Sequence, residues 1–380
     1  MRDFIEKVIK ERLSDVKIHK LLDGAVLFET ETSYDKLNFF CFNNIFAVIN
    51  LKEEFRTEAQ DVIAAKYKNG GNGKQSVSVL ESFINSILIK EIDSRGVIAN
   101  NSRNFNTFRI VISNENVPAA IDEKLRLQAE NFISRLSGLK VNRSLPDTEF
   151  WFLYRRDDIS RINFSVFMKR LTLRSSWDKT LHKGELPPPV AWVLCRLANL
   201  VHSDVVLDPF CGYGSIPEAA FKYFHITKFI ACDNNSEAAG YSAARFKKRK
   251  KSEFNFFTTD FSELPSLLGE VNLTGNLLTS PPESGQSRKQ PGIDAIVTDP
   301  PWGHFEKSGD DGFLVKMFEV FSKLLKDGGR AAVLYANDEN FTKAIPSSFE
   351  LQTQIPILLS GKKAVIYTLR KISSCLCASV

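Results

Sequence analysis

The strongest chemical signal in the sequence is a glycine turn that follows an acid. A short apolar run ends in Asp208, and Pro209, Cys211, Gly212 and Gly214 come directly after it, before a helical pattern begins. Glycines at such a turn let a ligand approach the backbone, and the start of the following helix offers unpaired N–H groups. The third glycine of the dinucleotide fingerprint and the Gly-Lys-Ser/Thr of a phosphate-binding loop are missing, which favours a nucleotide without a triphosphate. A plain tight turn is the alternative.

Two more acids follow the next two apolar runs. Asp233 and Asn234 come about 20 residues after the glycines, where dinucleotide-binding folds place an acid on the ribose hydroxyls. After the next run, Asp260 could accept a hydrogen bond from an adenine amino group while Phe261 packs on the ring. Taken alone, Asp260 is better explained as a cap at a strand end. Acids at three successive strand ends nevertheless favour a cofactor site.

The fourth signal is Asp299-Pro300-Pro301-Trp302, again at the end of an apolar run. The prolines fix an extended turn and leave the Asp299 carboxylate and a proline carbonyl free to accept hydrogen bonds. These acceptors suit an exocyclic amine on a planar base, and the indole offers a stacking face. Hydrogen bonds from both N–H groups favour a nitrogen lone pair that points at an electrophilic methyl group, without a metal. A structural proline turn is the alternative, and the similar Ser-Pro-Pro-Glu at 280–283 is interpreted as linker.

The elements around these motifs alternate between apolar runs and helical patterns, which indicates β-α-β units and a parallel sheet. The helices include 237–248 and 312–325, and the last two runs, 354–359 and 363–371, predict an antiparallel closing hairpin. The predicted parallel strands are 205–208, 228–233, 253–260, 294–299 and 331–336.

The first 175 residues show an α+β pattern instead, because strand-like runs and helical patterns mix there without strict alternation. The predicted strands are 24–30, 106–113, 149–156 and 162–170, and the predicted helices are 2–13, 76–92 and 119–137.

The domain boundaries follow from this change of pattern. We expect an α+β region at 1–173, a polar linker that ends in three prolines at 174–189, an α/β domain at 190–372 and a tail at 373–380. The stretch 271–292, rich in Ser, Pro, Gly and Asn, is predicted to be a flexible surface insertion.

Composition excludes several classes of protein. A chain of 380 residues suggests two or three domains, and 43% hydrophobic with 25% charged residues excludes a mostly disordered chain. A net charge of +5 permits an anionic partner without requiring one. No apolar run reaches the roughly 18–20 residues that span a bilayer, so we expect a soluble, intracellular protein without membrane contact. Six cysteines without a CxxC pair and five dispersed histidines predict reduced thiols and no metal site.

The motifs at 208–214, 232–235 and 299–303 together resemble class I S-adenosylmethionine-dependent methyltransferases that act on amino groups. More narrowly, they resemble the THUMP-domain RNA guanosine-N2 methyltransferases, whose domain junction and edge strand are similar to Leu-His-Lys at 181–183 and Leu-Pro-Asp at 145–147. The resemblance implies an α/β fold: a Rossmann-like class I methyltransferase domain with a seven-stranded, mostly parallel sheet and a closing hairpin. A ferredoxin-like and THUMP region of α+β type would precede it.

The resemblance also assigns roles to the matched residues. Asp299 and the Pro300 carbonyl, with Pro301, would orient the target amine, and Trp302 would stack on the base. Glu218 receives no role, because the helix after the glycine loop is one residue short of the family pattern. The residues implied in S-adenosylmethionine binding are Asp208, Pro209, Cys211, Gly212, Gly214, Asp233, Asn234, Asp260 and Phe261.

For the N-terminal region the resemblance implies RNA capture by shape and phosphate contact. The candidates are Arg155, Arg156, Arg161 and Lys183. Lys169 and Arg170 belong to the same basic cluster and 247–251 forms a second one, although a solvated strand face and a helix end explain these equally well.

The function expected from these motifs is methyl transfer from S-adenosylmethionine to the N2 amine of a guanosine, in tRNA. Adenine-N6 methylation of RNA or DNA, amide methylation of a protein glutamine, and a catalytically silent RNA-binding protein stay open as alternatives. The expected partner is RNA, with a small activator subunit in a eukaryote and a monomer otherwise. The expected compartment is the cytoplasm, or the nucleus in a eukaryote.

Overall fold

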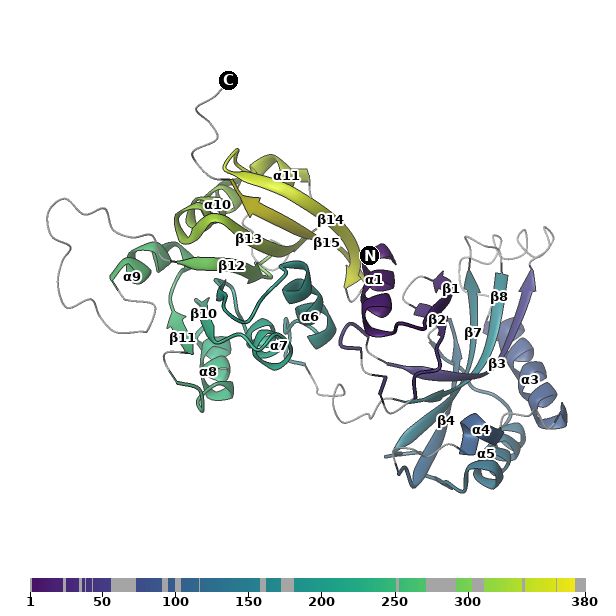
Figure 1. Ribbon diagram of the computed structural model, residues 1–380. Coiled ribbons are helices and arrows are strands. Elements are labelled where there is room, and N and C mark those ends of the chain that lie inside the picture. The colour runs from purple at the N-terminus through teal and green to yellow at the C-terminus, as the bar shows by residue number, and fades with distance from the viewer. Residues whose placement is uncertain are drawn as a thin grey trace, which may run out of the picture. The chain divides into compact units, whose positions relative to one another are not determined.

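The chain divides into two compact units, Arg2–Lys179 and Thr180–Val380. Figure 1 shows both, with the helices and strands labelled. The structure is a computed structural model. It describes residues 2–22, 25–33, 36–37, 39–42, 44–55, 73–90, 95–99, 104–115, 117–157, 162–171, 181–250, 253–270, 292–302, 311–336, 339–359 and 361–372.

A mixed sheet forms the centre of the N-terminal unit. β4 pairs in parallel with β7 and with β6, and the other neighbours pair antiparallel. The strands run in the order β3 (Phe46–Phe55), β8 (Ile162–Arg170), β7 (Thr148–Asp157), β4 (Thr107–Asn114) and β5 (Val117–Pro118), with β6 (Lys140–Val141) beside β4.

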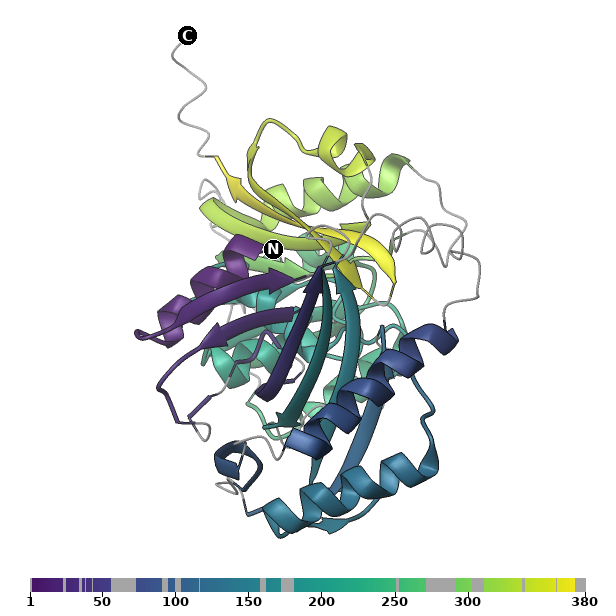
Figure 2. The ribbon, with the colours of Figure 1, turned by 90° about the vertical axis from the view of Figure 1, so that its right-hand side faces the viewer.

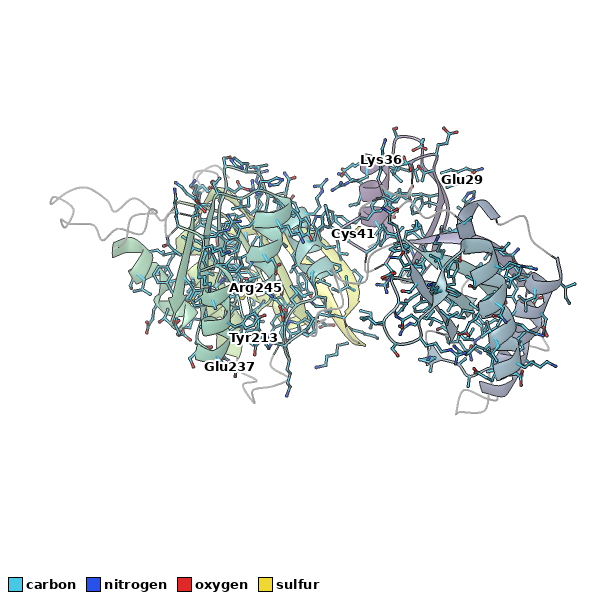
Figure 3. All side chains as sticks on the ribbon, turned by 90° about the horizontal axis from the view of Figure 1, so that it is seen from below. Glu29, Lys36, Cys41, Tyr213, Glu237 and Arg245 are labelled. Carbon is cyan, nitrogen blue, oxygen red and sulfur yellow. The ribbon has the colours of Figure 1, made fainter. Side chains whose placement is uncertain are left out.

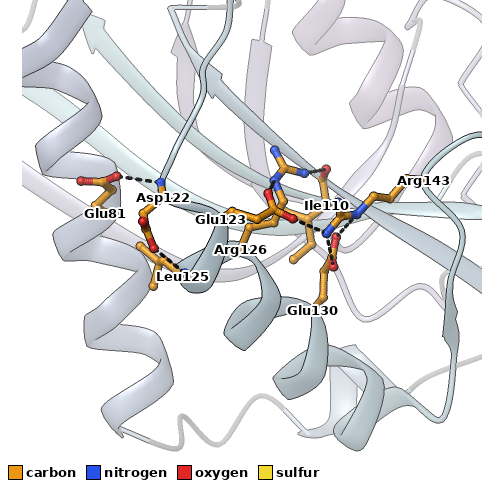
Figure 4. A network of polar contacts seen from close by, with 8 residues as sticks. All are labelled: Glu81, Ile110, Asp122, Glu123, Leu125, Arg126, Glu130 and Arg143. Atoms are coloured by element: carbon orange, nitrogen blue, oxygen red, sulfur yellow. Dashed lines mark hydrogen bonds and ion pairs between the residues drawn. The ribbon is translucent and has the colours of Figure 1, made fainter.

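Helices α3 (Gly73–Lys90) and α5 (Glu123–Ser137) cover one face of this sheet, as Figure 2 shows. Their apolar stripes pack with the alternating buried residues of β4 and β7, which explains why both helices are amphipathic. Asp122 caps α5 by accepting a hydrogen bond from the Leu125 amide at 3.0 Å. Figure 4 shows that α5 is also tied to the following loop, because Arg143 pairs with Glu123 and Glu130.

A smaller apolar cluster lies at the start of the chain. It joins α1 (Arg2–Arg12) to residues of the loops that flank the sheet, among them Leu37, Phe39 and Leu171. The short strands β1 (Lys17–Leu22) and β2 (Ala25–Glu29) pair only with each other among the described strands, and α4 (Arg95–Ala99) contacts α5 and β3.

The C-terminal unit contains a sheet of seven described strands. Five strands pair in parallel, and the hairpin of β14 and β15 closes the sheet antiparallel beside β13. The order is β11 (Phe254–Thr258), β10 (Lys228–Asp233), β9 (Val205–Asp208), β12 (Ile293–Thr298), β13 (Leu325–Ala336), β15 (Lys362–Lys371) and β14 (Phe349–Leu359). Because β9 and β12 are neighbours and parallel, the residues that follow them meet at one edge of the sheet.

In this unit, the helices after β9 lie in the connections between strands, and the first helix precedes the first strand. None of the described helices of the chain combines the length and the apolar character needed to cross a bilayer. The helices are α6 (Pro188–Leu197), α7 (Ser215–Tyr223), α8 (Ser236–Arg245), α9 (Leu264–Glu270), α10 (Asp311–Leu324) and α11 (Glu339–Ala344), with a 3₁₀ turn, η2, at Phe261–Glu263.

The predicted fold class is confirmed, including the seven strands and the closing hairpin. Several boundaries differ. The helix expected at 237–248 ends at Arg245, and the strand expected at 331–336 begins at Leu325. β3 was not predicted, although it begins with the apolar run Phe46–Ile49. The predicted insertion lies outside the described residues except for residue 292.

Candidate active site

Asp208, at the end of β9, is fully buried. Its Oδ1 accepts hydrogen bonds from the Thr298 hydroxyl at 2.7 Å and from the Phe210 amide at 3.1 Å. Its Oδ2 is buried and has no hydrogen-bond donor among the described residues. Burial raises the pKa of Asp208 to about 8, and the nearby charges of Asp233 and Asp299 add to this effect. The carboxyl group is therefore largely protonated at neutral pH.

The glycine loop between β9 and α7 is fixed by backbone contacts. The Cys211 amide donates to the Cys232 carbonyl at 2.9 Å, and the Gly212 amide donates to Asp233 Oδ2 at 2.7 Å. Gly212 and Gly214 have φ angles of +49° and +87°, which disfavour any residue with a side chain. A Cβ on Gly214 would lie 2.8 Å from the Ser242 hydroxyl. A Cβ on Gly212 would meet no described atom within 4 Å, so this side of the loop is open to a ligand.

The two other loop residues implied in cofactor binding are buried beside it. Pro209 is buried, and burial raises the pKa of the Cys211 thiol far above its usual value. Cys211 is therefore a neutral thiol, suited to packing and not to nucleophilic chemistry.

Asp233 links two loops at the end of β10. One carboxylate oxygen binds the Gly212 amide, and the other accepts from the Asn235 amide at 2.8 Å. Asn234 is exposed beside it, and the Asn235 side chain caps α8. The half-exposed Asp233 carboxylate therefore lies between the glycine loop and the start of α8, where a ligand hydroxyl could reach it.

Asp260 and Phe261 follow β11. The Asp260 carboxylate caps η2 by accepting from the Ser262 amide at 2.9 Å. Although burial opposes it, the hydrogen bonds from Ser262 and the charge of Lys316 lower the pKa of Asp260. Phe261 is buried and packs against Phe210, with ring centroids 4.8 Å apart. The aromatic ring is thus part of the core of this unit.

Asp299 follows β12 and lies beside Asp208, because their strands are neighbours. Burial raises the pKa of Asp299 to about 7, opposed by a hydrogen bond of 2.9 Å from the indole N–H of Trp302 to Asp299 Oδ1. Pro300 is buried, Pro301 is exposed, and Trp302 is half-buried against the core of the unit. The motif therefore presents a carboxylate that can exchange a proton near neutral pH.

The structure brings together residues that sequence reasoning missed. Thr298 donates to Asp208 and directly precedes Asp299, so it joins the glycine-loop strand to the Asp-Pro-Pro-Trp motif. Arg245, at the end of α8, donates to the Tyr213 carbonyl of the glycine loop and binds Glu185, in the segment before α6. The position of Thr298 directly before the motif was the only local signal for it. No local signal in the sequence indicates that Arg245 pairs with Glu185, because 60 residues separate them.

The four candidate RNA contacts lie in different surroundings. Lys183 is exposed, and Arg155 is half-buried on β7. The Arg156 guanidinium binds Glu115 with Nε and Oε1 2.7 Å apart. Arg161 lies outside the described residues.

The basic cluster on β8 does not form a solvated face. Lys169 is 1% exposed and donates to the Ile98 carbonyl at 3.2 Å, and burial lowers its pKa to about 8. Arg170 is also buried and binds Glu149. β8 lies between β3 and β7 with helices on one face, so these cations are structural. In contrast, the described residues of the second basic run, 247–250, are exposed.

A parallel sheet of this strand order, with a glycine loop after β9 and acids at the ends of β9, β10, β11 and β12, defines a class I methyltransferase domain. Residues 176–355 match the RMKL-like methyltransferase domain family.

Individual relatives are more distant. The chain is 25% identical over 295 residues to a tRNA (guanine(10)-N2)-dimethyltransferase of Methanocaldococcus jannaschii, across 73% of this chain and 72% of the relative. It is 26% identical over 204 residues to the U6 snRNA (guanine-N(2))-methyltransferase THUMPD2 of Bos taurus, across 53% of this chain and 35% of the relative. The chain thus spans little more than a third of the bovine protein.

The fold is also that of TrmN from Thermus thermophilus. The two structures superpose with a TM-score of 0.52 at 21% sequence identity, over 74% of this chain and 79% of TrmN. This similarity extends beyond the matched methyltransferase domain, because that domain alone makes up less than half of the chain.

Proposed function

We propose that the chain is an S-adenosylmethionine-dependent RNA methyltransferase that modifies the N2 amine of a guanosine. The observation that carries the proposal is the buried hydrogen bond of 2.7 Å between Asp208 and Thr298. It joins the end of the strand before the glycine loop to the residue before Asp299. A methyl donor on the loop and an amine on Asp299 would therefore be neighbours, as direct transfer requires.

The residues around the loop fit the cofactor. Asp208 Oδ2 is buried without a donor among the described residues, and the space beside Gly212 is open. A ligand with cationic groups would favour the ionised form of Asp208, while Asp233 offers a carboxylate for ribose hydroxyls. S-adenosylmethionine, when bound, supplies a methyl group on a cationic sulfur that leaves as a neutral thioether.

Asp299 would hold the target amine and take up its proton. In its ionised form the carboxylate accepts a hydrogen bond from the amine and favours a lone pair directed at the methyl carbon. The nitrogen must lose a proton as it is methylated, and the Asp299 carboxylate would accept that proton and pass it to water. A pKa of about 7 suits this exchange near neutral pH.

The substrate follows from the relatives and from the N-terminal unit. The relatives named above are guanine-N2 methyltransferases of tRNA and of U6 snRNA. We take tRNA as the substrate class, with the unit at 1–173 as a ferredoxin-like and THUMP region that captures it, followed by the junction at 174–189. Lys183 and Arg155 are the contacts proposed for its phosphates. Adenine-N6 methylation is the second candidate, because Asp299 and the Pro300 carbonyl suit either amine.

The proposed substrate places the enzyme in the cytoplasm, or in the nucleus of a eukaryote. There the protein would act as a monomer, or with a small activator subunit in a eukaryotic cell.

The product identifies the function. The protein is incubated with methyl-labelled S-adenosylmethionine and tRNA from cells that lack it, and the RNA is digested to nucleosides and separated by chromatography. We expect label in N2-methylguanosine, and none with Asp299→Asn. Label in N6-methyladenosine would support the second candidate. No label, together with no heat of S-adenosylhomocysteine binding in calorimetry, would leave only an RNA-binding role.

A further inference from the structure

Arg245, the last residue of α8, contacts three groups from separate parts of its unit. Nη1 donates to the Tyr213 carbonyl oxygen at 3.0 Å and lies 3.2 Å from a carboxylate oxygen of Glu218. Nη2 lies 3.0 Å from Glu185 Oε1. The Arg245 and Glu185 side chains are only 16% and 5% exposed, so water screens this pair weakly. Figure 3 labels Arg245 and Tyr213 in the C-terminal unit.

Glu185 belongs to the lead-in segment, defined here as residues 181–186, which precedes α6. Its Oε2 accepts from the His182 amide at 3.1 Å, and its own amide donates to the His182 carbonyl at 2.9 Å. The carboxylate therefore closes the turn of the lead-in segment with one oxygen and reaches Arg245 with the other.

Contacts between aromatic rings also connect the lead-in segment to the glycine loop and to α8. The His182 ring stacks on the Tyr213 ring, with centroids 4.4 Å apart and planes inclined by 6°. Tyr241, on α8, meets the His182 ring edge-on at 4.5 Å. The side chain of Tyr213 is therefore fixed by the lead-in segment and by α8, while its carbonyl is fixed by Arg245.

Tyr213 is the residue between the two glycines of the loop. Glycines allow many backbone conformations, so the loop needs external contacts to keep one shape. Asp233 supplies such a contact at the Gly212 amide, and Arg245 supplies the other at the Tyr213 carbonyl. A loop that is ordered before the ligand arrives binds more tightly, because less conformational entropy is lost on binding.

We propose that Arg245 is a positioning residue which, through Glu185 and Tyr213, keeps the glycine loop in its ligand-binding shape and makes the lead-in segment part of the cofactor site. This inference rests on the proposed function, in which the loop binds S-adenosylmethionine. The planar guanidinium binds a carboxylate and a carbonyl at once through two nitrogens, which a lysine ammonium on a flexible stem does not reproduce.

The test measures cofactor binding and stability of the full chain in Arg245→Lys and Glu185→Gln. The matched control is Arg249→Lys, because Arg249 follows the same helix but pairs with Glu253 at 3.6 Å. Binding of S-adenosylhomocysteine is measured by calorimetry, unfolding by a thermal scan, and turnover at varied S-adenosylmethionine. We expect Arg245→Lys to raise Kd and the cofactor KM about 10-fold or more, as loss of a charge-assisted contact implies.

We expect kcat at saturating cofactor to change little, because Asp299 is untouched, and the control to bind as the wild type does. Folded variants that bind S-adenosylhomocysteine with the wild-type Kd would overturn the inference, even if they unfold at a lower temperature. If Arg245→Lys does not fold, the isosteric Glu185→Gln decides by the same criterion. A wild-type protein that binds no S-adenosylhomocysteine would overturn the proposed function and this inference together.

Discussion

Both units bury carboxylates beside their sheets, and some of these acids form ion pairs, whereas Asp208 has no cation partner among the described residues. Glu149 on β7 is 2% exposed and forms ion pairs with Arg109 and Arg170. Burial alone would raise the pKa of Glu149, yet the Trp151 indole and the two arginines lower it overall. In the C-terminal unit, burial raises the pKa of Asp208 to about 8.

The opposite pKa shifts of Glu149 and Asp208 distinguish a carboxylate with a structural role from one with a functional role. A buried carboxylate that forms ion pairs already has its charge partners in the folded chain. A buried carboxylate with a raised pKa and an unpaired oxygen lacks a partner until a ligand supplies a cation or a hydrogen-bond donor. Asp208 is of this second kind. Asp299 follows the neighbouring strand at the same edge of the sheet, and it is half-buried with a raised pKa and a hydrogen bond from the Trp302 indole.

The largest effect that the comparison predicts is on catalysis. Asp299→Ala removes the acceptor proposed for the amine, so turnover should fall by about 10³-fold or more. Affinity for S-adenosylhomocysteine should change little, since the glycine loop is intact. Single-turnover rates and calorimetry on the same preparation measure both, and a large loss of cofactor binding would contradict the role given to Asp299.

The second prediction concerns stability. Glu149→Gln removes the carboxylate that pairs with the buried Arg170 and the half-buried Arg109, and should cost about 3–5 kcal/mol of unfolding free energy. Asp208→Asn replaces a carboxyl that is largely protonated at pH 7, so its cost should be smaller, about 1 kcal/mol or less. Urea unfolding without cofactor measures both variants. Equal losses would mean that the two buried acids do not differ in kind.

The third prediction is a pH dependence of opposite sign for stability and for turnover. Asp208 and Asp299 have pKa values of about 8 and about 7 in the folded state, against an ordinary value of 3.8. The folded state therefore holds more protons between these values, so their contribution to stability falls as pH rises from about 4 to 8. Turnover needs ionised Asp299 and should rise as pH passes about 7.

The smallest expected effect is a shift in the pH profile of turnover when Trp302 is replaced. Its hydrogen bond lowers the pKa of Asp299, so Trp302→Phe should move the midpoint of the turnover profile upward, by up to about one pH unit. Profiles of kcat for both proteins on one RNA measure the shift. A midpoint that moves downward would show that the indole does not stabilise the carboxylate.

Much of the C-terminal fold could be predicted from the sequence, because its strands are continuous apolar runs that end in a polar residue. The runs at 205–208 and 228–233 coincide with β9 and β10. The N-terminal unit was harder to predict. β3 was missed, and the basic residues Lys169 and Arg170 gave no sign in the sequence that β8 buries them.

The candidate site, too, could be predicted only in part. The sequence by itself determined which residues follow each strand, because hydrophobic period and turn residues are local properties of the chain. Only the tertiary structure decided that Thr298 binds Asp208, 90 residues away, and that Arg245 joins Glu185 to the glycine loop. These contacts depend on strand order and helix packing, which bring distant residues together and fix which charges lose their water.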